Sequence, residues 1–306
     1  MNIHKRFLLF LIKLLLLLVL LPSSAFAQLN IFACAPEWGA LAKEIGGTQV
    51  SVYAASNAAQ DIHHLRARPS FLAKMRKADL VFCTGASLES GWLPVLLQKA
   101  GDPKVQPGNV GHLMASDYVM RLEIPEAVDR SMGDVHSEGN PHIHLNPHNL
   151  ILIADELSKR LAKLLPQQAK LFNKNFEDFH THWLSNIDRW EQQTLSLNNK
   201  NVVVYHSNWI YLLEWLKLNR IATLEPVPGI PPRISHLETV LNSVQDLNIK
   251  GILLTPYQQN KAAAWLSKHS DIPVIELPYT VGGNEKAKDL ESLFEETLRI
   301  LLGTDA

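Results

Sequence analysis

The sequence predicts an α/β protein of two lobes, each with a parallel sheet flanked by helices, joined by a long helical linker. Short apolar runs alternate with longer amphipathic segments near both ends of the chain, which is the pattern of parallel strands connected by helices. Residues 149–197, in contrast, contain no strand-like run. Apolar side chains recur there at helical spacing. The sequence therefore divides into two α/β halves with a helical segment between them.

The first lobe is expected to cover residues 28–148. Its apolar runs predict strands at residues 29–35, 49–54 and 80–84. Its amphipathic segments predict helices at residues 37–45, 69–77 and 91–100. The polar, turn-rich segment at residues 129–148 is expected to be a loop that leads to the connecting helices.

The connecting segment, residues 149–199, is expected to hold two helices. The first carries apolar residues such as Leu150 and Leu157 on one face. Pro166 suits the first turn of the second helix, whose apolar face continues to Trp190. Because a helical connection is stiffer than a Gly/Ser linker, we expect it to limit how far the lobes swing.

The second lobe is expected to cover residues 200–306. Strands are predicted at residues 202–205, 251–255 and 274–277, and helices at residues 233–247, 258–268 and 286–302. Residues 225–237 are rich in proline, and we expect them to form a rigid turn that shapes the lobe rather than to bind a ligand directly.

Residues 1–27 have the features of a cleavable signal peptide, which predicts a periplasmic protein. Basic residues precede an apolar run at residues 7–21, and an Ala-Phe-Ala cleavage signal follows. An uncleaved membrane anchor is the alternative, but Lys13 interrupts the run. A lipoprotein is not expected, because Cys34 lies beyond the cleavage signal and its neighbours are bulky.

Composition excludes some partners and leaves the cysteines undecided. With 29 basic and 30 acidic side chains the chain has no global charge bias, so no nucleic-acid partner is expected. Cys34 and Cys83 both lie in strand-like apolar runs. In an exported chain they are equally consistent with a disulfide and with two buried free thiols.

Three histidines far apart in the chain are the candidate functional residues. His63 follows the second predicted strand, and His206 directly follows the strand VVVY. His142 lies in the loop that leads to the connecting helices. Ligands of open parallel sheets bind outside the carboxyl ends of strands, so all three side chains could face one cleft between the lobes. Neutral imidazoles gathered there would suit zinc.

Neighbouring histidines make the exact ligand set ambiguous. His64 adjoins His63, and His144 lies two residues beyond His142, so an extended loop would point both of its histidines the same way. His144 and His64 are therefore lower-ranked candidate ligands. His136 and His148 flank these two histidines, and they are consistent with exposed side chains or with weak binding of metal at the mouth of the cleft.

Four segments occur in an order that resembles a known family. They are QDIHHLRARPS, KADLVFCTGASLESGWLP, NPHIHLNP and YHSNWIYLLEWL. Together they resemble the zinc- and manganese-specific substrate-binding proteins of bacterial ABC importers, over nearly the whole mature chain. Departures from the family pattern include Ile62 in place of a proline, Leu65 in place of an aromatic residue and His144 in place of a tryptophan.

The resemblance implies that His63, His142 and His206 bind a metal ion between two lobes. A histidine at the third position is common in the family's zinc binders, so it implies Zn²⁺ rather than Mn²⁺ as the transported ligand. The implied function is capture of zinc and its delivery to an ABC importer membrane permease, without catalysis. A metallochaperone that loads the site is a second candidate partner, and we expect a monomer.

The resemblance does not assign a fourth ligand. The family often places an acidic residue after the last strand of the second lobe, where this chain has Pro278. The candidates that remain are water, His144, His64, Glu276 and an acidic residue of the loop at residues 129–148.

An open fourth position keeps two other functions under consideration. Three histidines and a metal-bound water are the arrangement of a catalytic zinc, so the alternative is a zinc-dependent hydrolase. The sequence contains no His-Glu-x-x-His pair, which disfavours this alternative. A structural zinc site, or an adhesin-like surface protein with the same fold, is the third hypothesis.

Overall fold

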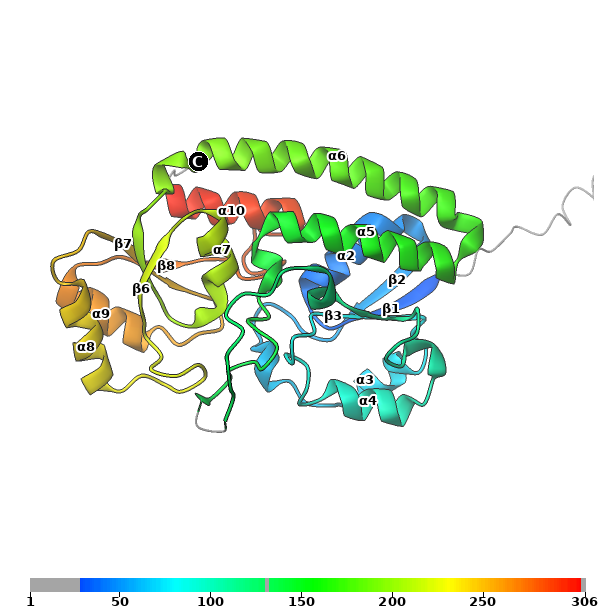
Figure 1. Cartoon of the computed structure of the whole chain (residues 1–306), viewed down its shortest axis with the longest axis horizontal. Helices are drawn as coiled ribbons and strands as arrows, with labels where there is room; N and C mark the ends of the chain where they lie inside the picture. Colours follow the sequence, from blue (N-terminus) through cyan, green and yellow to red (C-terminus); the bar gives the residue numbers. More distant parts are fainter. Residues whose placement is uncertain (1–27, 130–131, 304–306) are drawn as a thin grey trace, which may run out of the picture.

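The structure is a computed structural model that describes residues 28–129 and 132–303. It contains two four-stranded parallel sheets, each flanked by helices, with a long helix running above both (Figure 1). The predicted fold class is thereby confirmed. The predicted signal peptide, residues 1–27, lies outside the described residues.

The first sheet has the strand order β2-β1-β3-β4, with all neighbours parallel. Its strands are β1 (Leu29–Ala33), β2 (Val50–Ala54), β3 (Leu80–Cys83) and β4 (His112–Met114). Its helices are α2 (Pro36–Gly46), α3 (Pro69–Met75) and α4 (Leu93–Ala100). The sequence did not predict β4, because three residues are too short to give a periodic signal.

The second sheet repeats this arrangement with the order β6-β5-β7-β8. Its strands are β5 (Asn201–Val204), β6 (Asn219–Thr223), β7 (Ile249–Leu254) and β8 (Val274–Glu276). Its helices are α7 (Ile210–Trp215), α8 (Ile234–Val244) and α9 (Lys261–Ser270). The edge strand β6 was missed because it begins with two exposed polar residues, so no apolar run marks it.

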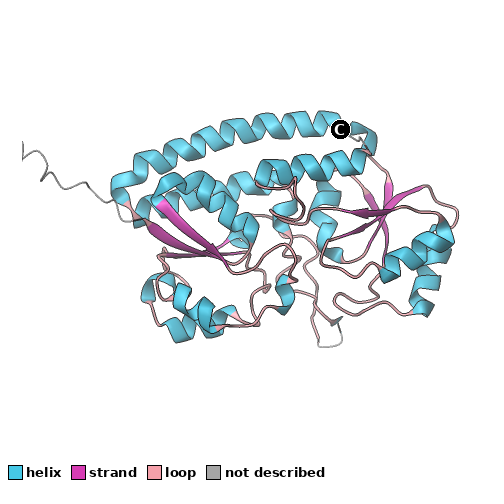
Figure 2. Cartoon of the chain, turned by 180° about the vertical axis from the view of Figure 1, so that it is seen from behind, coloured by secondary structure: helices cyan, strands magenta, loops and turns pink. Residues whose placement is uncertain are grey.

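Two helices form the connection, α5 (Pro147–Leu164) and α6 (Ala169–Gln193). The side chain of Asn146 caps α5 by accepting a hydrogen bond from the His148 amide. The last helix, α10 (Leu290–Leu302), returns from the second sheet and packs against α2 and α6. Seen from behind, the two sheets lie on opposite sides below this helical layer (Figure 2). None of the helices at residues 28–129 and 132–303 has the length and apolar character needed to cross a membrane.

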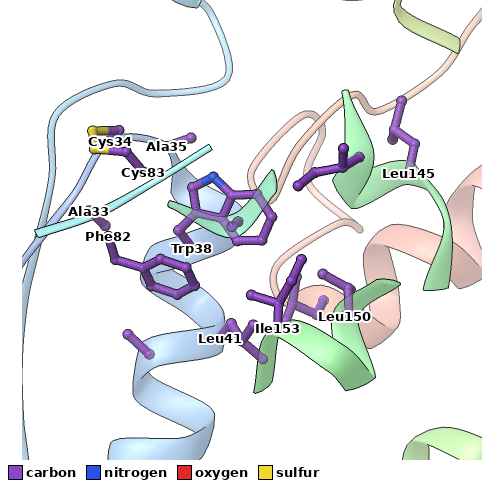
Figure 3. Close-up of a cluster of buried hydrophobic side chains, with 14 of the residues drawn as sticks. Ala33, Cys34, Ala35, Trp38, Leu41, Phe82, Cys83, Leu145, Leu150 and Ile153 are labelled. Carbon is purple, nitrogen blue, oxygen red and sulfur yellow. A yellow bond between two sulfur atoms is a disulfide. The ribbon is translucent and has the colours of Figure 1, made fainter. Parts of the chain in front are cut away.

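A buried cluster fixes the connecting helices to the first lobe. Trp38 and Leu41 of α2 pack beside Leu150 and Ile153 of α5 (Figure 3). The indole Nε1 of Trp38 donates a hydrogen bond to Thr84 at 2.8 Å, so the polar group of this fully buried side chain is satisfied. The start of α5, which follows the loop of His142, is therefore held in a defined place.

Cys34 and Cys83 form a disulfide at the edge of this cluster (Figure 3). Cys34 follows β1 and Cys83 ends β3, and these two strands are neighbours in the sheet. The disulfide decides between the two states that the sequence left open.

Candidate metal centre

The three predicted histidines come together from three different elements. His63 lies in a 3-10 turn at Ile62–His64 beyond β2, and His206 lies directly after β5. His142 precedes the 3-10 turn Ile143–Leu145 that leads into α5. Each offers one ring nitrogen, and these nitrogens all lie within 4.8 Å of one another. A strand end from each lobe and the entry to the connecting helices thus meet at one point.

The spacing of the three rings matches one shared metal ion. Ring centroids are 5.4 Å apart for His63 and His142, 5.6 Å for His63 and His206, and 5.8 Å for His142 and His206. For a tetrahedral zinc with Zn–N bonds of about 2.0 Å, the centroids of two imidazole ligands lie about 5.2 Å apart. The three measured centroid separations exceed this value by only about 0.2–0.6 Å, so the rings are spaced as ligands of one metal ion would be.

A hydrogen-bond partner stands behind each ring and occupies its Nδ1. The partners are Asp61 at 2.7 Å from His63, Tyr279 at 2.6 Å from His142 and Glu225 at 2.6 Å from His206. Because an ionised carboxylate can only accept, the Nδ1 atoms of His63 and His206 donate. This tautomer leaves their Nε2 atoms free to bind a metal, and such partners orient ligating rings and raise their basicity.

Burial sets the charge state of the site. His142 is buried, and desolvation together with the neighbouring His63 and His206 lowers its pKa well below the usual value. It is therefore neutral near pH 7, which is the form that ligates metal. Burial alone would raise the pKa of Asp61, but hydrogen bonding and charge interaction with His63 outweigh it and lower the pKa. Asp61 thus stays a negatively charged acceptor.

The lower-ranked candidates lie outside the set of three. Nε2 of His144 lies 3.0 Å from the Tyr279 carbonyl oxygen, and its Nδ1 lies 3.6 Å from Glu37. The buried His144 therefore joins residues of the two lobes through contacts of its own. His64 has a side chain 65% exposed to solvent, and Glu276 is exposed at the end of β8. The geometry gives no support to these three residues as fourth ligands.

The sequence did not identify two of the partners behind the rings. Glu225 follows β6, so a prediction of that edge strand would have placed it at a strand end beside His206. Tyr279 adjoins Pro278, in the segment where the family resemblance led us to look for an acid. Its phenol is buried, and desolvation raises its pKa well above the usual value, so it stays protonated.

A second cluster of potential ligands lacks the thiolates that it would need to bind a metal. Cys34, Cys83 and Glu89 offer atoms within 4.8 Å of one another. The two sulfurs are joined in a disulfide, so neither is a thiolate that could bind a metal.

Comparisons with known proteins give a family match and several relatives. Residues 31–302 match the protein family described as "Zinc-uptake complex component A periplasmic". PsaA, a manganese ABC transporter substrate-binding lipoprotein of Streptococcus pneumoniae, is 24% identical over 249 residues, or 78% of this chain and 76% of the relative. MntA, a manganese-binding lipoprotein of Bacillus subtilis, is 26% identical over 176 residues, or 56% of this chain and 52% of the relative.

Solved structures show the same fold. A crystal structure of ZnuA has a TM-score of 0.72 at 19% identity and covers 90% of this chain and 98% of its own. The Mn-bound periplasmic metal binding protein of Candidatus Liberibacter asiaticus has a TM-score of 0.73 at 18% identity, covering 90% of this chain and 99% of its own.

Proposed function

Since the chain belongs to the family of periplasmic A components of zinc-uptake complexes, and so is a metal-binding substrate-binding protein of an ABC importer, we propose that its cargo is Zn²⁺. It captures zinc with His63, His142 and His206 and delivers it to a membrane permease. The observation that carries this proposal is the meeting of three ring nitrogens within 4.8 Å. Each of these rings has a hydrogen-bond partner at its Nδ1.

The chemistry of the ligands favours zinc over manganese. Imidazole nitrogen suits zinc, whereas manganese prefers carboxylate and other oxygen ligands. The nearby carboxylates of Asp61 and Glu225 are hydrogen-bonded to ring nitrogens and stand behind the histidines. Relatives such as PsaA and MntA are named for manganese, so the metal must be tested on this chain itself.

Zinc titration of the mature chain tests the proposal. We expect one zinc per chain, bound far more tightly than manganese, when a chromophoric chelator competes for the metal. His63→Ala, His142→Ala and His206→Ala should each weaken binding strongly. His64→Ala is the matched control, because this neighbouring ring is exposed and lies outside the set of three. Unchanged zinc affinity in all three site variants would overturn the assignment.

The same variants separate capture from catalysis. Capture predicts zinc binding without turnover, so the zinc-loaded chain should not hydrolyse ester or phosphoester substrates. Zinc-dependent turnover that disappears in His206→Ala would instead support the hydrolase.

Export is part of the proposal. Cleavage after residue 27 would release a monomer into the periplasm, where it meets the permease and a metallochaperone. Mass spectrometry of the exported protein should find Gln28 at its N-terminus, and light scattering should find a monomer. Because several relatives are named lipoproteins, a lipid-modified cysteine is the result that would contradict this location.

A further inference from the structure

The loop that precedes His142 is attached to both lobes. We refer to residues 134–138 as the cleft loop. The Asp134 amide donates a hydrogen bond to the carbonyl oxygen of Pro228, in the second lobe, at 2.9 Å. On the other side, Ser87 of the first lobe donates to the carboxylate of Glu138 at 2.8 Å. The cleft loop therefore bridges the two lobes.

His136 lies in the middle of the cleft loop, next to the three histidines. Its ring centroid is 5.3 Å from that of His63, which is as close as His63 lies to His142 or His206. This separation is also near the value of about 5.2 Å for two imidazoles on one tetrahedral zinc. The distance alone makes His136 a neighbour of the site.

The hydrogen bonding of His136 leaves one nitrogen unused. The imidazole makes a hydrogen bond with the Ser87 backbone, and its Nε2 is buried without a partner. Among the described histidines, only His63 and His136 bury an unpartnered ring nitrogen, and these two rings are adjacent. A buried polar atom with no partner costs about 1–3 kcal/mol, and a metal ion bound by Nε2 of His136 would remove this cost.

We propose that His136 is the fourth protein ligand of the transported zinc, completing a site of four imidazoles. The inference rests on the proposed function, because it needs the other three histidines to bind the metal. His136 is not in the set whose nitrogens all lie within 4.8 Å of one another, so its ring must move inward when zinc binds. Since the cleft loop is tied to both lobes, this movement links metal capture to the position of the lobes.

A fourth imidazole has two consequences for the site. Four nitrogen ligands discriminate further against manganese, which prefers oxygen. They also fill the tetrahedron, so no position remains for the metal-bound water that a catalytic zinc requires. The site would then hold zinc without activating water.

X-ray absorption spectroscopy of the zinc-loaded mature chain tests this assignment directly. We expect four imidazole nitrogens in the wild type, and three with one oxygen in His136→Ala. Loss of a partner behind a ligand already costs about 10–100-fold in metal affinity, so loss of a ligand should cost at least about tenfold. His148→Ala is the matched control, because that exposed ring pairs with Glu191 at 2.9 Å, away from the site.

A conservative variant separates ligation from a merely structural role. His136→Asp keeps a side chain that can bind zinc, so it should restore four-coordination and part of the lost affinity. If His136→Asp binds as weakly as His136→Ala, the loss reflects disturbance of the loop and the assignment is wrong.

The remaining outcomes distinguish this inference from the proposed function. Zinc binding that depends on His206 but is unchanged in affinity and coordination by His136→Ala would overturn the fourth ligand alone. Failure of the wild type to bind zinc at all would overturn both.

Discussion

Glu225 gives the sharpest test of how the protein environment tunes the metal site. Its carboxylate accepts hydrogen bonds from Nδ1 of His206 at 2.6 Å and from the amide of Gly229 at 2.9 Å. The side chain is only 11% exposed, so water contributes little to its solvation. Glu225→Gln keeps the shape and a hydrogen-bond acceptor but removes the negative charge.

The expected loss follows from the charge and its distance to the metal. Across the imidazole, the carboxylate would lie about 6 Å from a zinc on Nε2, given a Zn–N bond of about 2.0 Å. At an effective dielectric constant of about 20, Coulomb's law gives about 3 kcal/mol per unit of metal charge, and so about 6 kcal/mol for Zn²⁺. This is an upper bound, because the amide still orients the ring. Outer-shell substitutions cost about 10–100-fold in affinity, which corresponds to about 1.4–2.7 kcal/mol.

Competition with a chromophoric chelator would measure this loss, with thermal unfolding to check that the variant is folded. Glu276→Gln is the matched control, since it removes the same charge from an exposed position at the end of β8. We expect no change in the control. Equal zinc affinity in Glu225→Gln and wild type would refute the view that the carboxylate supports His206 as a ligand.

Three further predictions follow from the structure. Replacing both Cys34 and Cys83 with alanine should lower the free energy of unfolding by about 4 kcal/mol, from the chain entropy of a loop closed over 49 residues; an unchanged urea midpoint would contradict this. Burial and neighbouring histidines lower the pKa of His142 well below 6.5 and that of His136 to about 3, so the unfolded chain binds more protons below pH 6.5. Their contribution to stability should be complete above pH 6.5 and should decline as the pH falls towards 3. Urea titrations of wild type and His136→Ala at several pH values would measure this contribution, and a contribution that grows as the pH falls would contradict the prediction. Tyr279→Phe should destabilise the protein by about 1–3 kcal/mol, because it removes the hydroxyl 2.6 Å from the buried Nδ1 of His142. Calorimetric unfolding would measure this loss, and an unchanged stability would show that the hydrogen bond does not stabilise the protein.

The sequence predicted the elements whose apolar pattern is long or concentrated. The connecting helices were recognisable because buried residues such as Leu150 and Trp190 recur at helical spacing. Inner strands such as β3 and β5 read as continuous apolar runs because both faces of a parallel sheet are covered. The edge strands β4 and β6 carry fewer buried residues, and the local pattern did not reveal them.

The division between sequence and tertiary structure is clearest at the metal site. The sequence alone determined that His63 and His206 follow strands and that His142 lies in a loop, because these are local properties of the chain. Only the tertiary structure decided which nitrogens meet and what stands behind them. Glu225 reaches His206 over 19 residues, and Tyr279 reaches His142 over 137 residues. The first contact depends on the pairing of β5 with β6 and the second on the packing of the His142 loop against the second lobe, and the local spacing of residues predicts neither.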